Sequence, residues 1–211
     1  AYEIKECDWS SDVCSSDLMA DQKISAMPAA NPLVGDELMP LVQDGANVQS
    51  TPNDVNALVT NRIALLSTIT QNAVANTATV ITFDTTAFSQ NISLVDGSKI
   101  TFAVGGFYVL NFSFQMANSD TQIHTADFWV RLNGTNYPLT NTTLDIPSKH
   151  GGVDGHIVAS WSIPGEATAG DYVEIVWSTN SANVSIEYTG TQTSPTRPAT
   201  PSAIVAVWQI G

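Results

Sequence analysis

The clearest pattern in this chain is an alternation of apolar and polar residues that follows the Gly105-Gly106 pair. After the glycines, apolar residues occupy every second position: Tyr108, Leu110, Phe112, Phe114 and Met116. Because successive side chains of a β-strand point to opposite faces, this spacing places one continuous apolar stripe against a core. The pattern predicts a half-buried antiparallel strand, and the glycines permit a tight bend before it.

Shorter segments with the same alternation recur from residue 71 onward, separated by Gly, Asn, Asp and Pro. They cover residues 79–83, 91–95, 126–133, 155–163, 171–178, 183–189 and 203–210. Short strands at near-regular spacing are typical of sandwiches and jelly rolls. The sequence therefore predicts an all-β fold, an antiparallel jelly-roll sandwich of about 8–10 strands.

The final segment differs from the others because it is apolar on both faces. One face would carry Ile204, Ala206, Trp208 and Ile210, and the other Ala203, Val205 and Val207. An exposed edge strand of this composition would leave an apolar surface in water. We therefore expect this strand to lie in the middle of a sheet, with its outer face covered by another subunit.

A small hairpin is expected before the sandwich. The Asp44-Gly45 pair separates residues 38–43 from residues 46–50, and such pairs favour two-residue turns that need positive φ. The stretch contains too few apolar residues to be stable alone, so we expect it to pack on a neighbouring chain or a larger assembly.

A short α-helix is expected after the hairpin, over about residues 54–69. Thr51, Pro52 and Asp54 form a helix-start signature, and apolar residues follow on one broad face that Arg62 interrupts. An isolated helix of this length is marginal in water. Two interpretations stay open: a neck between identical chains, or a brace on the hairpin.

Composition narrows the possible partners. Charged residues make up 13% of the chain and the formal net charge is −13. Nucleic acids and anionic lipids bind clustered Lys and Arg, so neither is an expected partner. No apolar run approaches the roughly 20 residues that a membrane-spanning helix needs, so no membrane insertion is expected.

Residues 1–18 share no periodicity with the rest and contain both cysteines, Cys7 and Cys14. They resemble a translated sequencing-library adapter, which implies a non-native segment and a natural start at Met19. The alternative is a disordered acidic arm with two thiols. Without this segment the chain has no cysteine, so disulfides, thiolate metal sites and a cysteine nucleophile are not expected.

Candidate metal ligands are few. His150 and His156 could join Asp154 at a metal ion, although a polar Gly-rich loop explains the same residues. The Asp120–His124 segment allows the same two interpretations. Asp120, Asp145 and Asp154 are the candidates for a loop calcium site, but their spacing is not that of a calcium-binding loop.

Trp129 and Tyr137 are candidate carbohydrate contacts, and packing against a neighbouring subunit is the equal alternative. No nucleophile with an adjacent base and no convergent carboxylate pair is evident. We therefore expect no enzymatic activity, no cofactor and no resident metal.

Three landmarks appear in a familiar order: the Gly106-Phe107-Tyr108 turn into an aromatic strand, the Trp161 strand followed by residues 170–177, and the apolar final strand. This order resembles the trimeric jelly roll of the complement globular-head and tumour necrosis factor-like superfamily, over about residues 72–211. The resemblance implies a homotrimer that meets around the final and central strands. The implied interface candidates are Ile204, Ala206, Trp208, Ile210, Val205, Val207 and Tyr108.

Residues 23–43 and 51–55 resemble the attachment segment at the start of many tailed-phage fibre and virion appendage proteins. The similar elements are Pro28-Ala29-Ala30, Gly35-Asp36-Glu37-Leu38 and Pro40-Leu41-Val42-Gln43. The resemblance implies an attachment segment over residues 19–70 and a trimeric head over residues 71–211.

Together the two resemblances imply a phage virion structural protein at the particle surface. It would be a homotrimeric fibre or capsid-decoration subunit that binds other virion proteins through residues 19–70. Its head loops would serve receptor binding on a host surface or its glycans; Trp129, Tyr137, His150 and His156 are the candidate contacts. The alternatives are a cellular bacterial carbohydrate-binding or adhesion module with the same head and, third, a glycan hydrolase.

Overall fold

A computed structural model describes residues 38–43, 46–51 and 61–211 of the chain. The chain divides into two compact units, Ala1–Asn53 and Asp54–Gly211, and each is described by itself. No helix that could cross a membrane is present in the described ranges.

The first unit contains a β-hairpin of β1 (Met39–Gln43) and β2 (Ala46–Ser50). The strands are antiparallel, and Gln43 is the register partner of Ala46, so two residues form the connection. This confirms the predicted hairpin, although Asp44 and Gly45 themselves lie outside the described residues.

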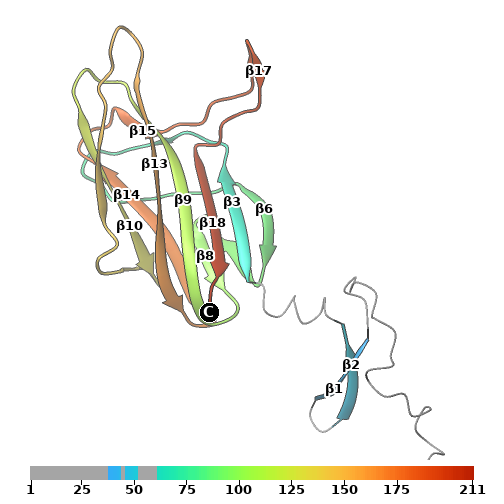
Figure 1. The fold of residues 1–211 in the computed structure, drawn as a ribbon. Helices are drawn as coiled ribbons and strands as arrows, with labels where there is room; N and C mark the ends of the chain where they lie inside the picture. Colours follow the sequence, from blue (N-terminus) through green and yellow to red (C-terminus); the bar gives the residue numbers. More distant parts are fainter. Residues whose placement is uncertain (1–37, 44–45, 52–60) are drawn as a thin grey trace, which may run out of the picture. The chain divides into compact units, whose positions relative to one another are not determined.

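The second unit is a sandwich of two antiparallel sheets, each of seven strands (Figure 1). The first sheet has the order β4-β15-β9-β18-β3-β6, and β13 also pairs with β9, along the whole length of β9. Its strands are β3 (Arg62–Ser67), β4 (Gln71–Asn72), β6 (Thr85–Gln90), β9 (Gly106–Asn118), β13 (Gly155–Ala167), β15 (Val184–Ile186) and β18 (Ala203–Gln209).

The second sheet has the order β11-β10-β14-β8-β7, with β12 paired to β10 and β5 paired to β14. Its strands are β5 (Thr79–Val80), β7 (Ile92–Val95), β8 (Lys99–Phe102), β10 (His124–Leu132), β11 (Thr135–Asn136), β12 (Thr142–Ile146) and β14 (Tyr172–Thr179). A separate ribbon of β16 (Gln192–Thr193) and β17 (Thr196–Arg197) extends from the loop before β18.

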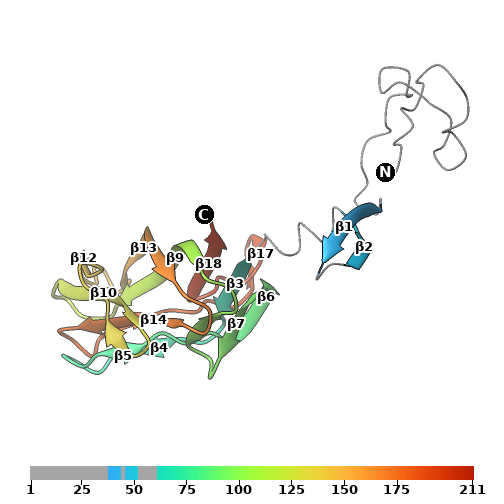
Figure 2. The ribbon, with the colours of Figure 1, turned by 90° about the horizontal axis from the view of Figure 1, so that it is seen from below.

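The five longest strands of the sandwich alternate between the two sheets in chain order: β9, β13 and β18 belong to one sheet, and β10 and β14 to the other. Figure 2, viewed from below, shows the two layers from their ends. This crossing of consecutive strands between two antiparallel layers confirms the predicted jelly-roll sandwich.

The predicted helix is wrong over residues 61–69, because residues 62–67 form β3. Ile63 and Leu65 are fully buried at every second position, and β3 lies between β18 and β6. Its backbone groups pair with two flanking strands, so tertiary pairing overrides the local helix preference. The part of the predicted helix over residues 54–60 lies outside the described residues.

Aromatic side chains bridge the two layers. Phe114 of β9 stacks on Phe128 of β10 at 5.3 Å between ring centroids, and Phe128 stacks on Trp177 of β14 at 6.2 Å. Trp161 of β13 meets the Phe112 ring edge to face at 4.5 Å. Offset and edge-to-face ring pairs add to the stabilisation that burial provides, so this cluster fixes how the sheets stack.

Candidate functional site

The outward side of β18 is the most unusual surface of the sandwich. Ile204 and Trp208 project away from the core with 38% and 40% of their area exposed, whereas Val205 between them is fully buried. The strand is central in its sheet, with β9 on one side and β3 on the other. Its apolar outer side is therefore continued by the outward side chains of both neighbours.

The register sets which side chains continue that surface. Across β18, the partners of Trp208 are Val109 and Arg62, those of Ala206 are Asn111 and Ala64, and those of Ile204 are Ser113 and Leu66. Phe88 of β6, opposite Ala64, is 49% exposed. We call the resulting surface the apolar face, and it comprises Ala64, Leu66, Phe88, Val109, Ile204, Ala206 and Trp208.

Two more exposed residues extend the apolar face at the end of β18. The Ile210 amide donates a hydrogen bond to the Phe107 carbonyl oxygen at 2.8 Å, and the Phe107 amide donates to the Gly211 carbonyl oxygen at 2.8 Å. This pairing holds the Phe107 and Ile210 side chains beside the sheet, 44% and 56% exposed.

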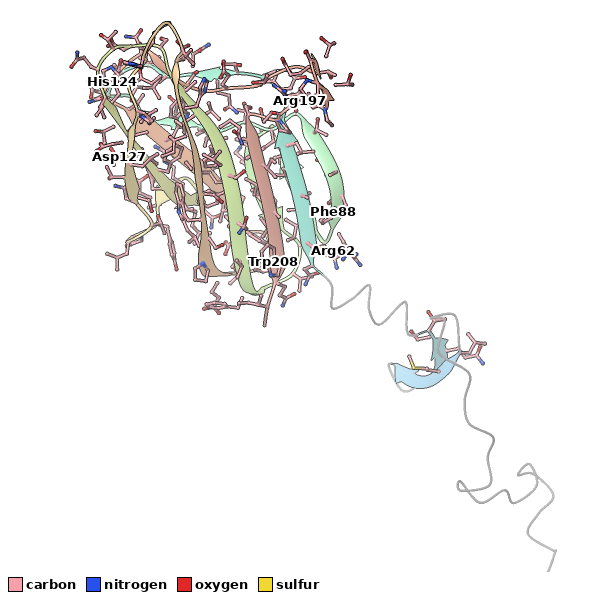
Figure 3. The ribbon with its side chains drawn as sticks, turned by 45° about the horizontal axis from the view of Figure 1, so that its top comes forward. Arg62, Phe88, His124, Asp127, Arg197 and Trp208 are labelled. Carbon is pink, nitrogen blue, oxygen red and sulfur yellow. The ribbon has the colours of Figure 1, made fainter. Side chains whose placement is uncertain are left out.

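Charge is confined to the two ends of this sheet face in the part of the chain that the structure describes. Arg62 lies at one end with its guanidinium carbon 5.6 Å from the Phe88 ring centroid, so it packs over the ring (Figure 3). At the other end, Nδ1 of His156 lies 3.5 Å from Oε2 of Glu187. The middle carries apolar side chains and uncharged Asn111 and Ser113.

The predicted interface residues divide into two groups. Ile204, Trp208 and Ile210 are exposed and Ala206 is half-buried, so all four are open to a second copy. Val205, Val207 and Tyr108 lie in the core with at most 1% of their area exposed. The inner face of the final strand is thus explained by the sandwich itself. An interface at the outer face stays a prediction.

Tyr108 illustrates the inner group. Its hydroxyl donates a hydrogen bond to the Val104 carbonyl oxygen at 2.7 Å, and its ring lies 4.5 Å from the Phe102 ring. Burial raises the pKa of this phenol, against a smaller lowering by the hydrogen bond with Asn61. Tyr108 therefore anchors the start of β9 within the core.

The three candidate calcium ligands, Asp120, Asp145 and Asp154, each have a local partner. Oδ2 of Asp120 lies 2.9 Å from Nε2 of His124, and the hydrogen bond with His124 leads those that hold the pKa of Asp120 below its usual range. Asp154 pairs with Lys149 at 2.7 Å, and Asp145 accepts a hydrogen bond from the Thr125 hydroxyl. No group of three or more His, Cys, Asp or Glu suited to a metal occurs among the described residues.

The four candidate ligand contacts, Trp129, Tyr137, His150 and His156, do not lie at one site. Trp129 and Tyr137 line one hollow, which His150 and His156 do not line. His150 is exposed in a turn where its backbone pairs with that of Val153. His156 faces Glu187 beside the apolar face.

The hollow has a volume of about 370 Å³, and Asp127, Trp129, Asn136, Tyr137, Leu139, Asn141 and Ser178 line it. Its polar residues were not among the candidates predicted from the sequence. Asp127 could have been found, because it lies two residues before Trp129 and so on the same face of one strand. Ser178 could not, because only the pairing of β10 with β14 places it opposite Asp127.

No protein-family model matches the chain, and no curated protein matches it. Solved structures do match, among them the crystal structure of murine APRIL, with a TM-score of 0.46 and 9% sequence identity. That match covers 72% of this chain and 99% of the APRIL chain. The strand order and register given above define the fold.

Proposed function

We propose that this chain is a structural subunit of a phage virion that assembles as a homotrimer through the apolar face of its head. Residues 19–70 attach it to other virion proteins, and the head is displayed at the particle surface as a fibre or decoration subunit. The proposal assigns it no catalytic step.

One observation carries the self-association: the exposed Ile204 and Trp208 lie on a central strand of a sheet. Exposed apolar residues scattered singly are ordinary, but a contiguous patch is typical of an interaction surface. Interface cores are depleted in charge and enriched in aromatic residues, and the apolar face has Trp208 and Phe88 with charge only at its ends. A second and a third copy would cover these side chains.

Two features support a trimer on a virion over other assemblies. The sequence resembles the trimeric jelly rolls, whose copies meet around the strands that carry the apolar face here. Residues 23–43 and 51–55 resemble virion attachment segments. The alternative, a cellular bacterial adhesion or carbohydrate-binding module, draws its support from the hollow that contains Trp129 and Tyr137.

Light scattering on the chain measures the assembly directly. We expect a mass three times the 22.5 kDa of one chain. Trp208→Glu should lower the mass to that of one chain, because it removes an aromatic anchor and buries a carboxylate, whose desolvation costs several kcal/mol per copy even beside its register partner Arg62. Val95→Glu is the matched control, since Val95 is 42% exposed but lies on β7 of the other sheet. A wild-type monomer at high concentration, or a Trp208→Glu variant of unchanged mass, would overturn the proposal.

Genome context separates the two functional alternatives. A virion protein is expected beside capsid, portal or tail genes. A cellular adhesion module is expected beside secretion or polysaccharide genes, and that finding would reject the virion role while leaving the trimer intact.

A further inference from the structure

The hollow lies on the sheet opposite the apolar face. Asp127 and Trp129 project outward from β10, because Ala126, Phe128 and Val130 between and beside them are buried in the core. In Figure 3, Asp127 lies at the side of the sandwich away from Phe88 and Trp208. A ligand here would not compete with self-association.

Hydrogen bonds fix the polar groups of the hollow before any ligand arrives. Oδ1 of Asn136 accepts from Nε1 of Trp129 at 2.8 Å and from Nε of Arg131 at 3.0 Å. With its carbonyl oxygen so engaged, the Asn136 side chain presents its amide nitrogen as a donor. The indole ring is held in one orientation by the same bond.

The Asp127 carboxylate is held in a similar way. Its Oδ1 accepts hydrogen bonds from Nδ2 of Asn141, at 3.3 Å, and from the Thr143 hydroxyl. Its Oδ2 accepts none from the residues that the structure describes, so it is available to a ligand hydroxyl. Ser178, the register partner of Asp127 on β14, adds a hydroxyl at the floor.

The wall of the hollow, residues 137–141, is tied to β10. The Tyr137 amide donates to the Val130 carbonyl oxygen at 2.9 Å. The Thr140 hydroxyl donates to the Tyr137 carbonyl oxygen at 2.8 Å and accepts from the Val130 amide at 3.2 Å. These bonds hold Leu139 at the rim with a φ of +62° and its side chain wholly exposed. A bulky residue in this conformation is strained, and such strain clusters at binding sites.

We propose that this hollow binds a neutral saccharide. The apolar C–H face of a pyranose ring packs on aromatic faces, which Trp129 and Tyr137 supply. Adjacent sugar hydroxyls both donate and accept hydrogen bonds, and the fixed acceptor of Asp127 with the fixed donor of Asn136 matches that pair. The Asp127 carboxylate lines the hollow and disfavours phosphate and acidic ligands, whereas Arg131 bonds Asn136 but does not line the hollow.

The size and rigidity of the hollow agree with a saccharide ligand. A hollow of about 370 Å³ is near the lower end of small-molecule sites, which suits one or two sugar rings. Groups held in place before binding lose little conformational entropy, which allows a small polar ligand to bind at all.

Saturation-transfer NMR on the full chain tests the proposal. The probes are methyl glycosides of glucose, galactose, mannose, N-acetylglucosamine, fucose and rhamnose, at millimolar concentration. We expect transfer to the ring C–H protons of at least one of them. For that glycoside, Trp129→Ala should raise the Kd by about tenfold or more. The substitution removes both the stacking face and the hydrogen bond from the indole that orients Asn136.

Two variants make the result specific. Asp127→Asn keeps the side-chain shape but replaces an acceptor with a donor, and we expect the same glycoside to bind more weakly. Val158→Ala, at an exposed apolar residue of β13 in the opposite sheet, should leave its Kd unchanged. Circular dichroism confirms that each variant is folded. Absence of transfer to every probe in the wild type, or equal Kd values for wild type, Trp129→Ala and Asp127→Asn, would overturn the proposal.

Discussion

At the residue scale, the residues with positive φ show which turns the local sequence specifies. Asp96 and Gly97 have φ of +52° and +73° and lie in the turn between β7 and β8. Asn133 and Gly134, with φ of +50° and +78°, close the β10–β11 hairpin by the same chemistry. Asn, Asp and Gly tolerate this conformation, so such turns can be read from the sequence. The positive φ of Leu139 could not be read from the sequence, because no local feature favours a leucine in this conformation.

Leu139→Gly tests whether Leu139 stores strain. Its φ of +62° is unfavourable for a leucine by about 1–2 kcal/mol, and its exposed side chain contributes little packing. We therefore expect unchanged stability or a gain of up to about 1 kcal/mol, measured by urea unfolding. Val74→Gly is the control, since Val74 is also exposed but has no positive φ, and it should lower stability. An equal loss in both variants would contradict stored strain at Leu139.

The lowered pKa of Asp84 predicts that the stability of the fold depends on pH. Its carboxylate accepts hydrogen bonds from the Thr68 amide at 3.1 Å, the Thr68 hydroxyl at 2.6 Å and the Thr85 hydroxyl at 3.1 Å. Burial raises the pKa of Asp84, but these hydrogen bonds together outweigh it and leave the pKa below its usual range. Such a group stabilises the fold above its unfolded-state pKa, and that contribution is lost as pH falls through the folded-state pKa.

Asp84→Asn should therefore lower the free energy of unfolding at pH 7 by less than about 1 kcal/mol, because the site is solvent-exposed. The difference from the wild type should shrink in acid, once the wild-type carboxyl is protonated. Urea unfolding at pH 7 and at pH 3 measures both values. Thr68→Val, which removes the hydroxyl donor to Asp84, should lower the free energy of unfolding at pH 7 by part of the same amount. A difference between wild type and Asp84→Asn that grows in acid would contradict a stabilising role for the Asp84 carboxylate.

At the element scale, strands with long alternation were readable and short ones were not. The aromatic stripe of β9 and the apolar inner side of β14 are visible in sequence because β9 has five apolar residues at alternate positions and β14 has three. β4, β5 and β11 have two residues each, too few to show a period. β3 was missed for another reason: Leu65 and Leu66 are consecutive, which suits a helix until its strand partners are known.

Gly155 tests how closely β13 approaches the segment before it. Gly155 begins β13 opposite Asn118, and a Cβ there would overlap the Pro147 carbonyl oxygen and lie 2.9 Å from the Ser148 carbonyl oxygen. Backbone atoms cannot move aside cheaply, so Gly155→Ala should cost about 1–3 kcal/mol in urea unfolding. Gly165 lies in the same strand with open space around it, so Gly165→Ala should leave stability within about 0.5 kcal/mol or raise it. Equal losses at both sites would show that the approach is not limiting.

At the scale of the whole molecule, the sandwich separates two different surfaces. The apolar face lies outside the sheet that contains β18, and the hollow lies outside the sheet that contains β10. The two-sided apolar strand predicted the first surface in part, since three of the seven predicted interface residues, Val205, Val207 and Tyr108, proved to be core. The second depends on contacts between β10, β14 and the 137–141 loop, which no single segment of sequence encodes. Packing the first surface between copies would leave the second open to a ligand.

Two parts of the chain are candidates for driving assembly, the sandwich unit and the hairpin unit. The compact unit Asp54–Gly211 contains the whole apolar face, and the hairpin unit contributes none of it. If the face is the interface, a chain of residues 54–211 should have three times its own mass in light scattering, and Trp208→Glu in that chain should reduce it to one. If residues 19–53 hold the copies together instead, the shortened chain should be a monomer and Trp208→Glu should have no effect on its mass. Because interface affinity depends on buried aromatic anchors more than on area, the tryptophan is the side chain whose loss distinguishes these two results most sharply.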